Sequence, residues 1–157
     1  MENIDLNCCE SLVYFTHLER GGAWHPATVP SEPWLMKIGN NVVVAADVKF
    51  FTHDVIHRCL NEVYQKKVIP LLGTIEIGNN VVIGANSIIL PNVKIADNVV
   101  IAAGSIVTKN IKENSVVGGN PTKVICSLDE LYKKRCIEKV NLTEKYDAEE
   151  MKNYYWR

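Results

Sequence analysis

Hydrophobic residues recur at every sixth position through the middle of the chain. The positions that carry Ile or Val in this rhythm are Ile77, Ile83, Ile89, Ile95, Ile101 and Val107. The next residue is often Gly or Ala, and the fourth residue after each of them is Val, Ile or Ser. An ordinary strand alternates with a period of two, and a helix has a period of about 3.6. A period of six therefore indicates a structural repeat rather than a series of independent strands.

A six-residue repeat is explained by a short strand, a corner and then another short strand. Three such steps close a triangular coil of about 18 residues, and such coils stack roughly 4.8 Å apart, the spacing of paired strands. Polar pairs in one phase of the repeat are Asn40-Asn41, Asn79-Asn80 and Asp97-Asn98. They mark corners, because Asn and Gly tolerate the left-handed backbone of tight turns. The sequence thus predicts an all-β solenoid with the periodic Ile and Val side chains inside it.

The rhythm is interrupted by an insert. The stretch that begins at Ile38 follows the same pattern, but it lies 39 residues before Ile77, which is not a multiple of six. An insert of about residues 51–74 therefore separates the two stretches. Loops that project from a regular scaffold often carry function, so we expect this insert to be a functional loop. Its candidate chemical groups are His53, Asp54 and His57.

The two ends of the chain have helical rather than six-residue spacing. Residues 2–19 show helical spacing, and Ser127 to Glu130 form a capping box that predicts a helix through about Arg135. A second C-terminal helix is predicted over residues 143–155. Such helices can cover the open ends of a solenoid, which would otherwise expose unpaired strand edges. We expect one domain with three parts: an N-terminal helical segment (1–22), the β-solenoid with its insert (23–126) and a C-terminal helical segment (127–157).

Composition limits the classes of binding partner and the cellular compartment that the sequence predicts. A net charge of -1 gives no electrostatic footprint for nucleic acid, and no apolar run is long enough for a membrane span. The acidic, polar start of the chain is unlike a secretory signal. The five cysteines are scattered and form no CxxC pair, which favours free thiols in a reducing compartment. We therefore expect a cytoplasmic protein without a bound metal.

Residues 31–126 resemble the hexapeptide-repeat acetyltransferases, the left-handed β-helix family. The likeness is carried by the repeat itself, by Thr52-His53-Asp54 and by GGNPTKVI at residues 118–125. Within the family, the chain looks most like the sugar O-acetyltransferases, including the maltose, galactoside and surface-polysaccharide enzymes. The resemblance implies a left-handed coil. It also implies a homotrimer that binds acetyl-CoA, its co-substrate, in the groove between neighbouring subunits.

The resemblance also assigns roles to individual residues. It implies that His53 is the catalytic histidine, and it places the acidic residue of the acceptor site at Glu32, with Asp54 and His57 as further candidates. The positions that match the CoA-binding residues of the family are Gly84, Ala85, Ala103, Thr108, Lys109 and Lys123. Two differences stand out. Val82 occupies a position where relatives often have Trp, and Thr52 and Asp54 flank the histidine where relatives often have a small residue and Pro.

The residue types fit acyl transfer. Imidazole has an ordinary pKa near 6.5, so His53 can remove the proton of a hydroxyl acceptor at neutral pH. A backbone N–H at the Gly84-Ala85 corner could stabilise the thioester oxyanion. Either Asp54 or Glu32 could fix the tautomer of His53. Lys109 and Lys123 are candidates for pairing with the phosphates of CoA.

Three other functions stay open from the sequence alone. The acceptor could be an amine of an amino sugar, because the repeat supports both kinds of transfer. A zinc enzyme of the γ-carbonic-anhydrase type uses a similar solenoid, but it needs three protein ligands and only His53 and His57 lie close together in the sequence. A non-catalytic solenoid that binds a partner is the third, and the histidine-bearing insert argues against it.

Overall fold

The computed structural model describes residues 24–28, 30–137, 149 and 152. Along the chain the elements are β1 (Trp24–Thr28), the 3-10 helix η2 (Pro33–Leu35), β2 (Met36–Ile38), β3 (Val42–Phe50), α1 (His57–Tyr64), β4 (Ile75–Ile77), β5 (Val81–Ile83), β6 (Ile88–Ile89), β7 (Val93–Ile95), β8 (Val99–Ile101), β9 (Ile106–Val107), β10 (Ser115–Gly118), β11 (Lys123–Ser127) and α2 (Leu128–Ile137). Most strands are only two to five residues long, as a repeat with frequent corners requires.

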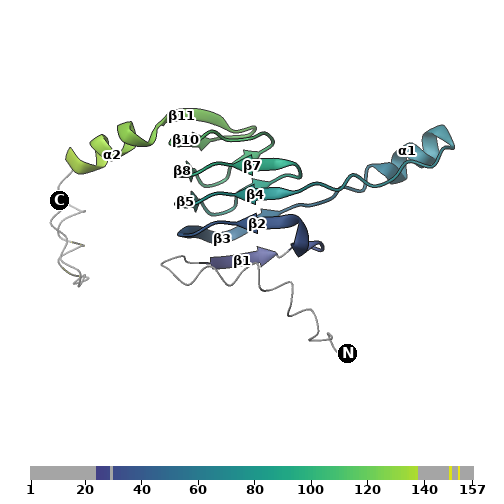
Figure 1. The fold of residues 1–157 in the computed structure, drawn as a ribbon, viewed down its shortest axis with the longest axis horizontal. Coiled ribbons are helices and arrows are strands. Elements are labelled where there is room, and N and C mark those ends of the chain that lie inside the picture. Colours follow the sequence, from purple (N-terminus) through teal and green to yellow (C-terminus); the bar gives the residue numbers. More distant parts are fainter. Residues whose placement is uncertain (1–23, 29, 138–148, 150–151, 153–157) are drawn as a thin grey trace, which may run out of the picture.

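The strands stack in parallel at the spacing that the repeat predicts. Val81 pairs with Val99, so the chain returns to the same position one layer further on after 18 residues. The same register links β4 to β7 and β6 to β9. One sheet has the order β11-β10-β8-β5-β3-β6-β9, with β1 beside β3, and a second has the order β2-β4-β7. Figure 1 shows these layers one above another, and the predicted stack of parallel strands is confirmed.

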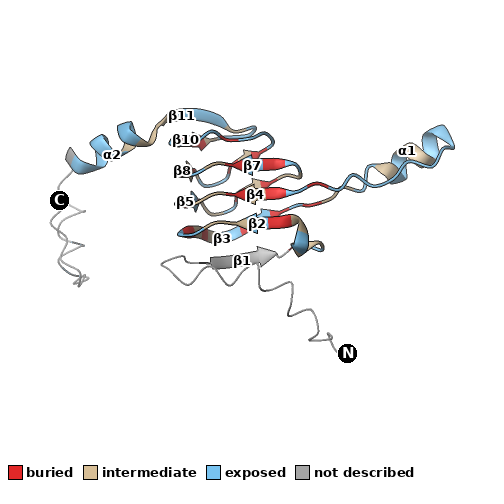
Figure 2. Ribbon diagram, viewed as in Figure 1, coloured by how far each residue is buried: buried red, intermediate tan, exposed pale blue. Residues whose placement is uncertain are grey.

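The periodic side chains form the core of this stack. All six Ile and Val residues of the rhythm are buried, and none is more than 4% exposed. Figure 2 shows that buried residues recur in successive strands of the stack. Burying each such side chain contributes roughly 1.5–3 kcal/mol relative to leaving it in water. The core is therefore the sum of many similar layers.

An asparagine ladder holds one corner of the stack. Asn41, Asn80, Asn98 and Asn114 all adopt left-handed backbone, with φ between 54° and 59°. Their side-chain amides bond from one layer to the next: Asn41 donates to Asn80 at 3.0 Å, Asn80 to Asn98 at 2.9 Å and Asn98 to Asn114 at 3.0 Å. The corners predicted from the polar pairs are confirmed, and each Asn serves both the turn and the stacking.

The insert differs from the loop predicted for it, because it contains the helix α1. Residues 54–72, called the arm below, project away from the stack in Figure 1. The arm starts and ends at neighbouring points: His53 and Leu72 form an antiparallel bridge, and the Gly73 N–H donates to Thr52 O at 2.8 Å. Because the arm leaves and returns at one corner, β4 still pairs with β2 in register.

The C-terminal boundary of the stack also differs from the prediction. Its last parallel layer is β10, and β11 runs back antiparallel to β10, so residues 123–126 do not continue the repeat. Gly119, with φ 96°, lies in the turn between them, a conformation that other residues rarely adopt. The capping box is confirmed: the Glu130 N–H donates to Ser127 Oγ at 3.2 Å, and α2 runs to Ile137.

The other predicted helices lie outside the described part of the chain. Residues 2–19 are not described, and of residues 143–155 only two positions are. Among the residues that are described, no helix has the length and apolar character needed to cross a bilayer.

Candidate functional site

His53 lies where the arm leaves the stack, three residues after the end of β3. Its Nδ1 is 2.9 Å from Oε2 of Glu32, and its side chain is 36% exposed. Glu32 precedes η2, so the two groups come from segments 21 residues apart in the sequence. Of the two acidic residues considered for orienting His53, Glu32 is the one that contacts it.

Thr52 completes this cluster. The Thr52 hydroxyl donates to the same oxygen, Oε2 of Glu32, at 2.6 Å. Thr52 is buried, with 1% exposed, because the inward alternation of Val48 and Phe50 continues through it. The hydrogen bond from Thr52, together with that from His53, holds the pKa of the Glu32 carboxyl below its ordinary value.

The cluster has a defined protonation pattern. An ionised carboxylate only accepts hydrogen bonds, so the contact with Glu32 requires Nδ1 of His53 to carry a proton. In a neutral imidazole, Nε2 then holds the free lone pair, and within the described part of the chain no group bonds to it. A hollow of about 370 Å³ opens at this point, lined by Pro30, Ser31, Lys49, Phe50, Phe51, Thr52 and His53. The cluster thus places an imidazole with a free ring lone pair beside a space for a small molecule.

Asp54 and His57 lie on the arm and make different contacts. Asp54 Oδ1 accepts the Ile56 N–H at 3.1 Å, which shapes the turn that leads into α1. His57 Nδ1 is buried and has no hydrogen-bond partner among the described residues. Both residues line a second hollow of about 530 Å³, whose other lining residues are mostly apolar: Ile56, Leu60 and residues 68–72. The structure thus brings Asp54 and His57 together. Their hollow shares no lining residue with the hollow beside His53.

The small residues predicted to bind CoA occupy another corner of the stack. Gly84 follows β5, and a Cβ placed on it would lie 2.4 Å from the backbone nitrogen of Ala103 in the next layer. The Gly84 N–H already donates to Ile101 O at 2.8 Å. Of the two backbone N–H groups at the Gly84-Ala85 corner, that of Gly84 is therefore already bonded within the stack. Ala85 stacks below Gly104, whose N–H donates to Ala85 O at 2.8 Å.

The remaining predicted residues follow β9 or begin β11. Thr108 and Lys109 are exposed and come directly after β9. Since β9 pairs with β6 and β6 with β3, these two residues share a corner of the stack with Phe51 and Thr52. Lys123 pairs with Gly118 across β10 and β11. Val82, at the centre of β5, is 40% exposed to solvent.

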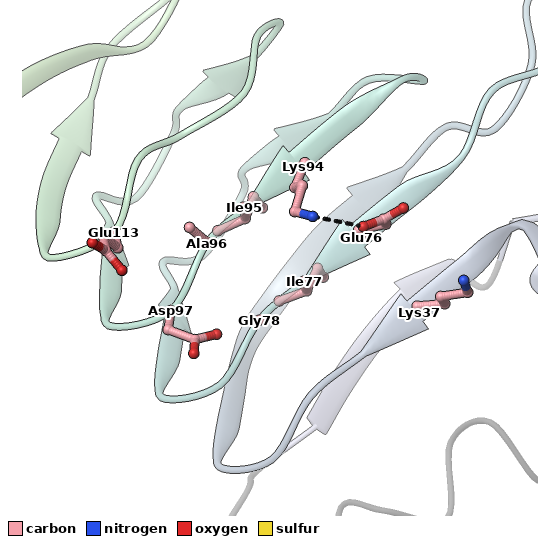
Figure 3. A pocket seen from close by; sticks show the side chains of 9 residues that line it. All are labelled: Lys37, Glu76, Ile77, Gly78, Lys94, Ile95, Ala96, Asp97 and Glu113. Atoms are coloured by element: carbon pink, nitrogen blue, oxygen red, sulfur yellow. Dashed lines mark ion pairs between the residues drawn. The ribbon is translucent and has the colours of Figure 1, made fainter.

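The sheet β2-β4-β7 carries a third hollow of a different kind (Figure 3). Its outward positions are charged, and Lys94 pairs with Glu76 at 3.3 Å, with the two side chains 66% and 42% exposed. The hollow contains none of the residues predicted to act in catalysis or binding. Exposed ion pairs of this type contribute little to stability.

No group of three His, Cys, Asp or Glu side chains that could hold a metal ion occurs within the described ranges. The sequence analysis assigns no role to Thr52, although Thr52 belongs to the segment that resembles the family's histidine loop. The signal was present, because strict alternation from Val48 through Phe50 predicts that Thr52 points inward.

Known proteins resemble this chain in sequence and in structure. The family model described as bacterial transferase hexapeptide (six repeats) matches residues 74–109. Protein CapG of Staphylococcus aureus is 47% identical over 128 residues, which cover 82% of this chain and 73% of that protein.

Two solved structures are similar over most of the chain. A maltose O-acetyltransferase from Clostridium difficile 630 has a TM-score of 0.56 and 27% identity, covering 81% of this chain and 78% of that one. A galactoside acetyltransferase in complex with coenzyme A also has a TM-score of 0.56, with 26% identity and coverage of 94% and 82%.

Proposed function

The chain belongs to the bacterial hexapeptide-repeat transferase family and is an acyltransferase, and we propose that it moves an acetyl group from acetyl-CoA to a hydroxyl group of a sugar or surface-polysaccharide precursor. Two of its structural relatives are a maltose and a galactoside acetyltransferase, and the second was solved with coenzyme A. The observation that carries the proposal is the contact of His53 with Glu32 beside an open hollow.

In the proposed reaction His53 is the general base. Nε2 takes the proton of the acceptor hydroxyl while the hydroxyl oxygen forms a bond to the thioester carbon of acetyl-CoA. The carbon–sulfur bond then breaks, and the CoA sulfur leaves with the proton that His53 returns. Glu32 orients the ring through Nδ1 and stabilises the imidazolium that forms between these steps.

We propose that acetyl-CoA lies along the corners that carry the small residues and the lysines. Ala85 and Ala103 leave room beside the backbone, and the Ala85 N–H is the candidate donor for the oxyanion in place of that of Gly84. Lys109 and Lys123 would pair with phosphates, with Thr108 beside them. The acceptor would enter near Glu32, with Asp54 and His57 of the arm as its further contacts.

We also propose a left-handed coil and a homotrimer, as the resemblance implies. The two sheets differ in a way that supports a subunit interface. Val43 of β3, Val82 of β5 and Val100 of β8 stand side by side and point outward. The equivalent positions of β2, β4 and β7 are charged. A stripe of outward valines favours cover by a second copy of the chain, whereas charges favour solvent.

The proposal is tested by an acceptor screen. The purified protein is incubated with acetyl-CoA and a panel of neutral sugars, amino sugars and uronic acids, and the released thiol is measured. Thiol release should depend on an acceptor hydroxyl, and mass spectrometry should find an acetyl ester on that sugar. Transfer to an amine alone would contradict O-acetylation, and absence of CoA binding at millimolar concentration would contradict the enzyme assignment.

A further inference from the structure

We propose that Thr52 is a positioning residue, whose buried hydroxyl holds the Glu32 carboxylate in place against Nδ1 of His53. The inference rests on the proposed function, because it assumes that His53 is the base. It assigns a role to a side chain that borders the hollow but is only 1% exposed and takes no part in the proposed proton and acetyl transfers.

The geometry of the cluster supports this role. Thr52 and His53 are adjacent in the sequence, yet both reach Oε2 of Glu32, at 2.6 Å and 2.9 Å. Thr52 is 1% exposed, so its hydroxyl has lost its contact with water and needs a partner inside the protein. Its partner is the Glu32 carboxylate, and because an ionised carboxylate only accepts, the hydroxyl must donate.

The Glu32 carboxylate depends on Thr52 for its position because the local backbone of Glu32 does little to fix its side chain. It lies outside the strands, with φ -115° and ψ 71°, and its carboxylate makes no capping bond to η2. The Thr52 backbone, in contrast, is fixed by the arm, since Thr52 O accepts the Gly73 N–H at 2.8 Å. A buried, fixed hydroxyl therefore restrains an acidic side chain that is 21% exposed.

The hydroxyl also affects the charge of the cluster. Hydrogen bonds to a carboxylate favour its ionised form, and the bond from Thr52 is the largest cause of the lowered pKa of Glu32. An ionised Glu32 keeps the proton of His53 on Nδ1 and the lone pair on Nε2. Loss of the hydroxyl would leave the carboxylate free to turn and would raise its pKa.

The experiment compares Thr52→Val, which keeps the shape and removes the hydroxyl, with Thr52→Ser, which keeps the hydroxyl. Assays use acetyl-CoA and the sugar of the screen that gives the highest rate. Thr52→Val should lower kcat about 10-fold, the factor expected for a lost hydrogen bond to a charged group, with KM for acetyl-CoA unchanged. Thr52→Ser should restore most of the rate. The matched control is Ser115→Ala, which removes a buried hydroxyl bonded to Glu113 O and should leave kcat unchanged.

A double-mutant cycle separates positioning from a general loss of structure. If Thr52 acts through Glu32, Thr52→Val should add little to the effect of Glu32→Gln. A carbon NMR titration should also show a higher pKa for the Glu32 carboxyl in Thr52→Val and a restored pKa in Thr52→Ser. If Thr52→Val does not fold, Thr52→Ala takes its place with the same expectations.

The outcomes distinguish this inference from the proposed function. A full rate in Thr52→Val, or additive effects in the cycle, would overturn the role of Thr52 while leaving His53 as the base. An unchanged rate in His53→Ala would overturn the proposed function itself.

Discussion

The stack and the base of the arm differ in whether their residues repeat from layer to layer. In the stack, each kind of residue recurs: Ile83 pairs with Ile101 of the next layer, 18 residues later, and Asn80 repeats as Asn98. At the base of the arm nothing recurs. His53, Glu32 and Thr52 form a cluster that appears in one layer, where the rhythm is broken. Stability is spread over many similar positions, and the candidate chemistry is concentrated in one.

This difference predicts which substitutions damage which property. A change inside the stack should lower the free energy of unfolding, because it affects packing between layers. A change in the cluster should lower turnover with little effect on the fold, because the cluster lies beside the core rather than within it.

The largest effect on stability is expected from Ile101→Ala. Ile101 is 1% exposed at the centre of the core, and truncating a buried Ile typically costs about 2–5 kcal/mol. Urea unfolding followed by circular dichroism measures this change. Lys94→Ala is the control, since Lys94 is exposed and its ion pair with Glu76 lies in solvent; a loss of equal size there would contradict the layered core.

A smaller effect is expected from Gly84→Ala. The added Cβ would meet the Ala103 backbone at 2.4 Å, and backbone cannot move aside without shifting a layer. Overpacking of this kind costs roughly 1–3 kcal/mol. The control is Gly104→Ala, where nothing lies within 4 Å and only the φ of 70° opposes a side chain. If both variants unfold at the same urea concentration, the close approach of the layers at Gly84 is not what limits this position.

The smallest effect on stability is expected at Glu32, and it depends on pH. The folded protein lowers the pKa of this carboxyl, so the stability that it contributes is present above its ordinary pKa and is lost as pH falls through the lowered value. Thermal unfolding of the wild type and Glu32→Gln should therefore differ at pH 7 and converge in acid. A difference that stays constant down to pH 3 would mean that Glu32 is not held ionised by its neighbours.

Most of the stack could be predicted from the sequence because every layer obeys the same local rules. Ile77 predicts a core position and Asn80 predicts a corner, and the same residue types recur at the equivalent positions of the next layers. The cluster could be predicted only in part. His53 was found through a motif, but its contact with Glu32 depends on how a segment 21 residues away folds beneath the arm, and no periodicity encodes that.

Two further features escaped prediction for related reasons. The helix α1 forms within an insert whose length says nothing about its structure. The reversal after Gly119 ends the stack although Val124 and Ile125 look like another layer, and both are in fact exposed. In each place the chain leaves the repeat, and local pattern no longer decides the fold.

The most direct test of the proposed mechanism is the turnover of His53→Gln with acetyl-CoA and a sugar acceptor, measured together with the affinity for CoA. Removing the base should lower kcat about 10²-fold or more. CoA should bind as it does to the wild type, because His53 lies outside the residues proposed to hold it, and the unfolding curve should be unchanged. A variant with wild-type turnover would contradict the assignment of His53 as the base.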